Sequence, residues 1–266
     1  MAAEELSWVP GDVDISKPNA ARVYDYFLGG ANNFDVDRVF AKKLTEILPD
    51  APFLAIENRG FLRRAVQFLA EQGIRQFLDL GSGIPTVGNT HEIAQAVDPT
   101  ARVVYVDFEA VAVAHSEMIL ADVPNATIVR ADFRQPQTVL TNPVTLEMLD
   151  FGQPVAVLMF SSVHFISDED KPWDIVAAFR DATVPGSYLA FSHATNDHRP
   201  EVADAVAEYK NAANSAYVRS KDQFVKFFDG YDLVEPGAVY TAEWRAELDV
   251  CDPWRAGAYA GVGIKR

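Results

Sequence analysis

The sequence has few cysteines and few basic residues, and each shortage excludes a class of protein. Cys251 is the single cysteine among 266 residues, so neither an internal disulfide nor a zinc site built from several cysteines can form. Lysine and arginine number 23 against 38 acidic residues, which gives a formal net charge of −15. Such a surface repels the phosphate backbone of nucleic acids. We therefore expect a small-molecule or protein substrate, no nucleic-acid partner and a reducing, cytoplasmic location.

Long apolar stretches are also missing. No run approaches the ~20 residues that cross a bilayer, and the start MAAEELSWVPGDVD lacks the basic and apolar regions of a secretion signal. We therefore expect no membrane association. Because histidine and acidic residues show no dependable metal-ligand spacing, we also expect no metal. The sequence does not indicate an oligomeric state.

Short apolar runs alternate with helical segments from residue 73 onward. Seven of them predict strands, at 76–80, 102–107, 126–130, 154–160, 187–192, 231–236 and 258–265. Continuous apolar strands between helices are typical of a parallel sheet that is covered on both faces. We predict an α/β fold with a Rossmann-like, doubly wound, seven-stranded and mostly parallel sheet, in which the last two strands form an antiparallel edge.

The residues before this sheet predict helices. Asn19 is suited to cap a helix that ends near Gly29, Asp35 to cap the next helix, and a third helix is predicted over 59–72. We expect residues 1–72 to form a helical extension over the carboxyl ends of the strands. Residues 73–266 would form the core of the same globular unit.

A glycine loop follows the first predicted strand in DLGSG. Gly81 and Gly83 let the backbone turn tightly, so that a ligand can approach its amide groups. The third glycine of a dinucleotide fingerprint is replaced by Thr86, and Asp79 precedes the loop. A carboxylate there repels a pyrophosphate but favours an ammonium group. The loop therefore favours a cofactor with a positively charged end over NAD.

Two further strand ends carry carboxylates. Asp107 ends the second predicted strand, where it can accept hydrogen bonds from both hydroxyls of a ribose, and Phe108 beside it can cover an adenine ring. Asp132 follows the third strand, where it can accept a hydrogen bond from the adenine amine. Each aspartate alone is equally well explained as a helix cap. Their order along the chain together favours a nucleoside site.

DLGSG, the Asp107 strand end and ADF resemble motifs of the class I S-adenosylmethionine-dependent methyltransferases. From about Pro18 onward, segments such as PNAARVYDYFLGGANNFDVDR, DLGSGIPTVGNTHEIAQ and PGSYLAFSHAT are similar to a bacterial family named S-adenosyl methyltransferase, formerly a domain of unknown function. This resemblance implies S-adenosylmethionine as methyl donor and S-adenosylhomocysteine as product. The cofactor-binding residues that it implies are Asp79, Gly81, Ser82, Gly83, Asp107, Phe108, Ala131, Asp132, Phe133, Phe160, Ser161 and Ser162.

Three other residues are candidates for contacts with the cofactor or the acceptor. Arg59 could pair with the carboxylate of the cofactor, with an exposed surface position as the alternative. His164 and His193 follow the fourth and fifth predicted strands, where a histidine can remove a proton from an acceptor. Hydrogen bonding within loops is the alternative for both histidines.

The acceptor is expected to be a small molecule that is methylated at oxygen or nitrogen. Phe160-Ser161-Ser162 stands where methyltransferases of nucleobase amino groups carry Asp/Asn-Pro-Pro-Tyr/Phe, which argues against DNA as substrate. Two other functions remain open. The fold could bind the cofactor without catalysing transfer, or, with less support, belong to an NAD-dependent oxidoreductase.

The stretch DYFLGGANNFDVDR has two glycines but neither the Gly-Lys-Ser/Thr ending nor the preceding strand of a phosphate loop. We expect a helix end and a tight turn that form part of a lid over the strand ends. A helix hairpin that only packs is the alternative. The residues expected at the lid or substrate are Tyr24, Tyr26, Gly29, Gly30, Asn32, Asn33 and Phe34.

Overall fold

An open, mostly parallel sheet forms the centre of the computed structural model, which describes residues 15–85, 88–212 and 215–266. The strand order is β3-β2-β1-β4-β5-β8-β6, and β7 pairs with β8. β1 to β5 pair in parallel, whereas β8 runs antiparallel to β5, β6 and β7. The strands are β1 (Gln76–Leu80), β2 (Arg102–Asp107), β3 (Ala126–Arg130), β4 (Ala156–Phe160), β5 (Tyr188–Ala194), β6 (Tyr231–Leu233), β7 (Val239–Tyr240) and β8 (Ala258–Lys265).

This sheet confirms the predicted α/β class, the predicted strands and the antiparallel edge. β7 is the addition. It spans two residues, too few for an apolar run or an alternating pattern to indicate a strand. Thr86, on which part of the argument against NAD depended, lies outside the described residues.

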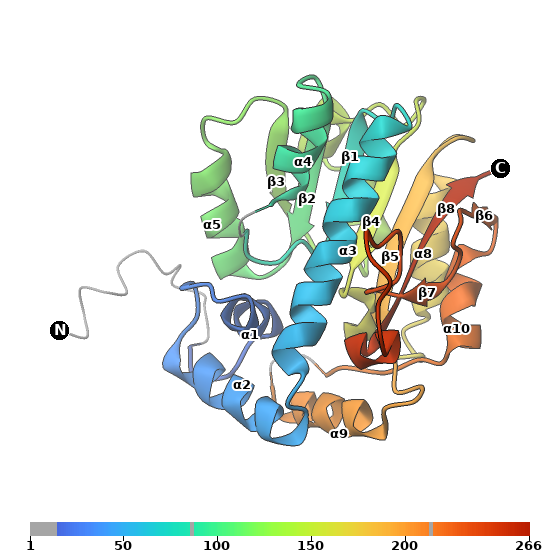
Figure 1. Cartoon of the computed structure of the whole chain (residues 1–266). Helices are drawn as coiled ribbons and strands as arrows, with labels where there is room; N and C mark the ends of the chain where they lie inside the picture. The colour runs from blue at the N-terminus through green and yellow to red at the C-terminus, as the bar shows by residue number, and fades with distance from the viewer. Residues whose placement is uncertain (1–14, 86–87, 213–214) are drawn as a thin grey trace.

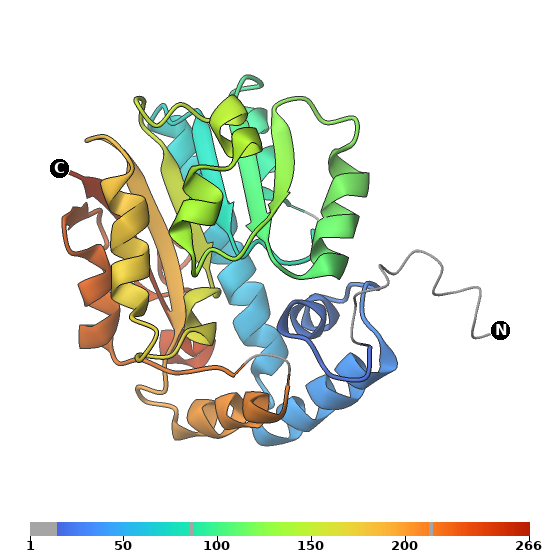
Figure 2. The same cartoon turned by 180° about the vertical axis from the view of Figure 1, so that it is seen from behind.

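Helices cover both faces of the sheet (Figures 1 and 2). Leu78 and Leu80 of β1 are buried in one apolar layer, whereas Phe77 is buried in the other. One layer contains α3 (Ala51–Glu71), α4 (Thr90–Val97) and α5 (Ala110–Leu120); the other contains α6 (Pro136–Leu140), α7 (Pro143–Met148), α8 (Pro172–Asp181) and α10 (Lys221–Val225) with the 3-10 turn η3 (Lys226–Phe228). In the described ranges no helix is both long and apolar enough to cross a bilayer.

The remaining helices gather below the sheet in Figure 1. They are α1 (Ala20–Phe27), α2 (Asp35–Ile47) and α9 (Pro200–Glu208), with the 3-10 turns η1 (Val163–Phe165), η2 (Tyr209–Asn211) and η4 (Pro253–Ala256) nearby. Phe40 and Leu44 of α2 share an apolar cluster with Val202 and Ala205 of α9. Segments from the two ends of the chain therefore form one helical layer at the carboxyl ends of the parallel strands.

The helix starts differ in detail from the predictions. Asn19 caps α1 as expected, since its side chain accepts a hydrogen bond from the Ala21 backbone at 2.9 Å. Asp35 is instead the first residue of α2, and Asp37 accepts from the Phe34 backbone N–H at 2.9 Å. α3 begins at Ala51 rather than at residue 59. Proline in the first turn is compatible with this earlier start.

Candidate functional site

A cavity of about 240 Å³ lies between the carboxyl ends of the strands and the helical layer, beside the reversal of strand order between β1 and β4. Open α/β sheets bind ligands in this position. We call its charged side the strand-end half: Arg59, Asp79, Gly81, Ser82, Gly83, Asp107, Phe108, Glu109, Asp132, Phe133, Arg134 and Ser162. We call its other side the helical half: Phe27, Leu44, Leu48, Ala51, Leu54, Phe165, Val202, Ala205, Val206 and Tyr209.

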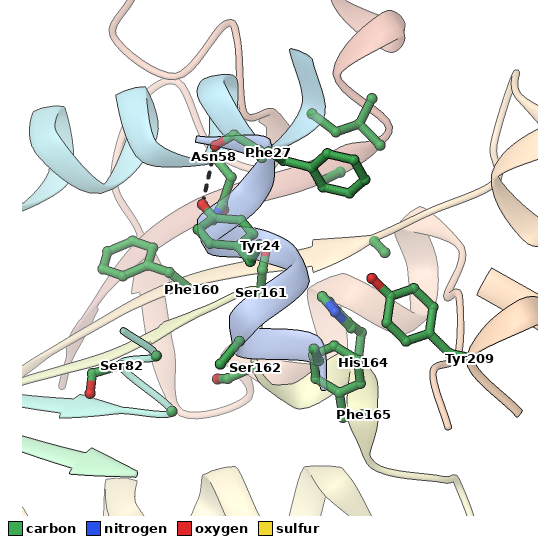
Figure 3. Close-up of a pocket in the computed structure, with 18 of the residues that line it drawn as sticks. Tyr24, Phe27, Asn58, Ser82, Phe160, Ser161, Ser162, His164, Phe165 and Tyr209 are labelled. Atoms are coloured by element: carbon green, nitrogen blue, oxygen red, sulfur yellow. Dashed lines mark hydrogen bonds between the residues drawn. The ribbon is translucent and has the colours of Figure 1, made fainter. Parts of the chain in front are cut away.

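In the close-up of Figure 3, Ser82 of the strand-end half lies at one side, and Phe27 and Tyr209 of the helical half lie toward the other. Tyr24 lies between them. Residues of both halves therefore line one cavity.

The glycine loop after β1 has the backbone conformation that its sequence requires. Gly81 has a φ of +72°, and a Cβ added there would lie 2.6 Å from the Cβ of Ser162. Gly83 has a φ of +67°, and within the described residues, its two chain neighbours apart, no atom lies within 4 Å of the position that a Cβ would take. The loop is also tied to β2, since the Gly83 backbone N–H donates to Asp107 Oδ2 at 2.8 Å. Gly81 thus allows close packing, and Gly83 leaves the backbone open.

Asp79 and Asp107 are buried carboxylates on the cavity wall. Asp79 Oδ2 accepts a hydrogen bond from the Thr90 hydroxyl at 2.7 Å, and Asp107 Oδ1 accepts from the Glu109 backbone N–H at 2.9 Å. Burial raises the pKa of each carboxyl to about 6. Carboxylates in this state are stabilised by a ligand that brings positive charge or hydrogen-bond donors.

Asp132 and Phe108, the predicted adenine contacts, are both in contact with Arg134. The Arg134 Nη2 lies 2.6 Å from Asp132 Oδ2, and the guanidinium carbon lies 5.5 Å from the centre of the Phe108 ring. Burial acts to raise the pKa of Asp132, but the hydrogen bonds from Arg134 outweigh it, and the pKa lies below its usual value. A purine bound here has to displace Arg134 or share its contacts.

Four buried polar atoms on cavity-lining residues have no hydrogen-bond partner in the described part of the chain. They are Arg59 Nε, Ser82 Oγ, Ser162 Oγ and His164 Nδ1. Such atoms are uncommon in folded proteins and call for an explanation. A polar ligand supplies one: Arg59 fits a carboxylate, and Asp79 on the same wall fits an ammonium group. These residues therefore fit the amino-acid end of S-adenosylmethionine.

The structure brings one of the two candidate histidines to the cavity. His164 lines it, and burial together with the charge of Arg219 lowers its pKa to about 3, so the ring is neutral. His193 is not a lining residue. Its Nδ1 lies 2.8 Å from the Ala194 carbonyl, and its Nε2 lies 2.6 Å from Arg219 Nη1. His193 lies within β5, and because both of its nitrogens are engaged with Ala194 and Arg219 it is not placed for proton transfer.

The predicted lid residues also fall into a group that lines the cavity and a group that does not. Tyr24 lines the cavity, where Asn58 donates to its hydroxyl at 3.0 Å. Asn58 in turn accepts from the Ser192 hydroxyl at 2.5 Å, which connects α1 through α3 to β5. The structure does not bring Tyr26, Gly29, Gly30, Asn32, Asn33 or Phe34, nor Ala131 of the cofactor set, to the cavity lining.

Asp25 organises the turn that contains Gly29, Gly30, Asn32 and Asn33. Its Oδ2 accepts from the Asn32 backbone N–H at 2.9 Å and from the Asn33 side chain at 2.8 Å. A Cβ on Gly30 would lie 2.0 Å from Asp25 Oδ1, and Gly29 has a φ of +78°. The two glycines and two asparagines therefore build a turn around a buried carboxylate.

A buried ion-pair cluster between the helical extension and the site has no counterpart in the predictions. Arg22 of α1 is 1% exposed. Its Nε lies 2.8 Å from Asp37 Oδ2, and its Nη1 lies 3.3 Å from Glu109 Oε1. Glu109 lines the cavity two residues after Asp107. The one sequence signal for this cluster is a charged residue within the short helical segment that Asn19 caps.

The strand order, the glycine loop after β1 and the carboxylates at the ends of β1 and β2 define a class I methyltransferase fold. More narrowly, the chain belongs to the family described as S-adenosyl methyltransferase, whose model matches residues 7–266.

Two solved structures are similar over nearly the whole chain. One is a protein from Thermobifida fusca YX that is assigned as a methyltransferase: it is 41% identical, the match covers 98% of this chain and 99% of that one, and the TM-score is 0.93. The other is a DUF574 family protein from Streptomyces avermitilis, 36% identical over 95% of this chain and 99% of that one, with a TM-score of 0.92. No curated protein matches the chain.

Proposed function

We propose that this protein transfers a methyl group from S-adenosylmethionine to a small-molecule acceptor, at an oxygen or nitrogen atom. The observation that carries the proposal is the continuous cavity, in which buried carboxylates on one side adjoin an apolar chamber on the other. When bound, S-adenosylmethionine supplies an electrophilic methyl group on a sulfonium. Two binding regions in one cavity suit a donor and an acceptor that have to meet.

The strand-end half supports the donor side of this proposal. Asp79 would accept hydrogen bonds from the ammonium group, Arg59 would pair with the carboxylate, and Asp107 would hold the ribose hydroxyls. Phe108 and Asp132 would contact the adenine once Arg134 moves or shares its contacts. Much of the rate of such a displacement comes from holding the reacting atoms ~3–3.5 Å apart and in line.

His164 would orient the acceptor. Its neutral ring and unpartnered Nδ1 suit it to accept a hydrogen bond from an acceptor hydroxyl or amine. S-adenosylmethionine would supply the methyl group and keep the electron pair of the carbon–sulfur bond on its sulfur, while His164 would hold the acceptor oxygen in place for the transfer. The acceptor proton becomes far more acidic during this step, so it can pass to Nδ1 and then to water even though the pKa of His164 is low.

Calorimetry with S-adenosylhomocysteine tests the donor site. We expect the purified protein to bind it, and we expect Asp107→Ala to lower the affinity ~100-fold, because hydrogen bonds to a charged group contribute about 1.5–3 kcal/mol each. Asp204→Ala removes an exposed aspartate of α9 and serves as the matched control. Circular dichroism checks that each variant is folded. No binding by the parent protein would overturn the proposal.

A second candidate function is cofactor binding without transfer. The observation that favours it is the low pKa of His164, together with the position of His193 away from the cavity lining. Enzymes often use a base with a pKa close to the working pH. Incubation with S-adenosylmethionine and a panel of phenols, alcohols and amines, followed by mass spectrometry, separates the two. Any acceptor that gains a methyl group excludes the binding-only function.

A further inference from the structure

Among the residues that the structure describes, no charged residue lines the helical half of the cavity. The described charged residues of the lining all belong to the strand-end half: Arg59, Asp79, Asp107, Glu109, Asp132 and Arg134. The helical half is lined by aliphatic and aromatic side chains from α1, α2, α3, η1, α9 and η2. A charged acceptor would lose its hydration there without meeting a counter-charge, which is strongly unfavourable.

The helical half nevertheless carries the hydroxyl group of Tyr209, and His164 also lines the cavity. In Figure 3 the hydroxyl of Tyr209 points toward the ring of His164, and Phe165 lies beside that ring. Burial raises the pKa of Tyr209, so its hydroxyl stays protonated. A protonated hydroxyl can donate, and the unpartnered Nδ1 of His164 can accept. Together they match one small polar substituent that both donates and accepts, such as a hydroxyl.

Salt bridges between residues outside the cavity lining connect the segments that form the helical half. Lys43 of α2 pairs with Glu208 of α9 at 2.5 Å, and Asp50, just before α3, pairs with Arg199 at 3.2 Å and Arg255 at 3.0 Å. The size and shape of a ligand should therefore affect its binding in the helical half, because salt bridges connect the helices on either side of it.

The wall is also closely packed where α3 meets the start of β8. A Cβ at Gly257 would lie 2.8 Å from the Leu54 side chain. Leu54 and Gly257 both line the cavity, so this contact fixes one boundary of the chamber.

We propose that the acceptor is an uncharged molecule with an aromatic or similarly compact apolar body and a hydroxyl group. Its body binds in the helical half, and its hydroxyl is directed to His164 and Tyr209. The inference rests on the proposed methyl transfer, since it names the acceptor class for that cavity. It excludes amino acids, nucleotides and carboxylic acids as preferred acceptors.

Paired probes test the charge preference in the parent protein. 2-Naphthol is compared with 6-hydroxy-2-naphthoate, and 4-phenylphenol with 4'-hydroxybiphenyl-4-carboxylate, by calorimetry with and without saturating S-adenosylhomocysteine. We expect at least one uncharged probe to bind ~10-fold or more tightly than its carboxylate, because the carboxylate loses hydration without a partner. Equal or tighter binding of both carboxylates, or binding of neither uncharged probe, would overturn the inference.

A pair of substitutions on α9 locates the bound probe. Ala205 is buried and lines the cavity, whereas Ala207 on the same helix is exposed. We expect Ala205→Leu to weaken the uncharged probes ~10-fold, because filling a packed site displaces its ligand, while Ala207→Leu leaves their affinity unchanged. Both variants should bind S-adenosylhomocysteine like the parent protein. Equal effects of the two leucines would count against this binding place.

The two proposals fail in different ways. If S-adenosylhomocysteine binds but the probes show no preference, the acceptor class is wrong and the methyltransferase proposal stands. If the parent protein does not bind S-adenosylhomocysteine, the methyltransferase proposal fails, and with it the role of the chamber as an acceptor site. Probe binding in the absence of S-adenosylhomocysteine then still shows whether the chamber prefers uncharged ligands.

Discussion

The two halves of the cavity are built in different ways. The strand-end half consists mostly of residues that directly follow β1, β2, β3 and β4, and it carries all the charged lining residues. The helical half consists of residues from helices that are far apart in the sequence, and its lining is mostly apolar. A backbone hydrogen-bonding ladder positions the first half, whereas side-chain packing positions the second.

This difference suggests which half determines which property. Residues at the ends of paired strands are held in place by the sheet, so the donor side should tolerate changes elsewhere in the molecule. The helical half can change its shape through substitutions on α2 or α9 without altering the strand ends. Function in such folds is determined by the site more than by the architecture. We therefore expect acceptor specificity and donor affinity to respond to separate sets of substitutions.

The largest effect is expected at Arg22, whose ion pairs connect α1 and α2 to Glu109 of the strand-end half. Arg22→Met leaves the buried carboxylates of Asp37 and Glu109 without their shared cation. Removing one partner of a buried ion pair typically lowers the free energy of unfolding by about 3–5 kcal/mol. Urea denaturation followed by circular dichroism measures the change.

Arg38→Met provides the matched control. Its partner Asp35 is 96% exposed at the side chain, so we expect a change within about 1 kcal/mol. If the two variants lost the same stability, the fold of the helical extension would not depend on the buried ion pairs of Arg22. That result would contradict the positioning of the helices independently of the strand ends.

The sequence predicted the sheet well because buried parallel strands are continuous apolar runs. The predicted start of α3 was too late because the apolar pattern is interrupted in the first part of this helix. Asn58 is buried in α3, and a polar residue at a buried position interrupts the apolar periodicity on which a helix prediction depends. The hydrogen bonds that satisfy Asn58 come from Tyr24 and Ser192, which no local pattern can indicate.

The strand-end half of the site was predictable in part, because a loop that follows a strand lies at a known edge of the sheet. Asp79, Gly83 and Asp107 all line the cavity as expected. Val202 and Ala205 of α9 were not predicted there, since apolar spacing on a helix is the same whether that face packs in a core or lines a cavity. The turn around Asp25 was not predicted either, because the carboxylate that requires Gly30 and Asn33 is identified only in three dimensions.

Asp79→Asn should separate stability from donor binding within the strand-end half. Burial raises the pKa of Asp79 to about 6, above the ordinary value of ~3.9. The folded protein therefore holds the proton more tightly than the unfolded chain, so stability falls as the pH rises from ~4 to about 6, and the full destabilisation is present above that range. Without ligand at pH 7.5, the free energy of unfolding of the variant should exceed that of the parent protein by about 1–3 kcal/mol.

The same variant should bind S-adenosylhomocysteine ~10- to 100-fold more weakly, because the ammonium group loses its charged partner. In the parent protein, affinity should fall as the pH is lowered through about 6, where Asp79 and Asp107 take up protons. Calorimetry between pH 5 and 8 measures both effects. A variant that gained stability yet kept full affinity would show that Asp79 does not contact the ligand.

The smallest effect is expected at Arg134, where the strand-end half is partly occupied by its own side chain. Arg134 holds Asp132 and lies over Phe108, so adenine has to compete with it for both contacts. Arg134→Ala should raise the affinity for S-adenosylhomocysteine ~2- to 5-fold, since a surface ion pair contributes about 1 kcal/mol or less. Arg63→Ala, which removes another exposed arginine side chain, should leave the affinity unchanged. A loss of affinity confined to Arg134→Ala would show instead that the guanidinium stays in place and stacks on the adenine. Donor binding would then depend on this side chain as well as on the strand ends.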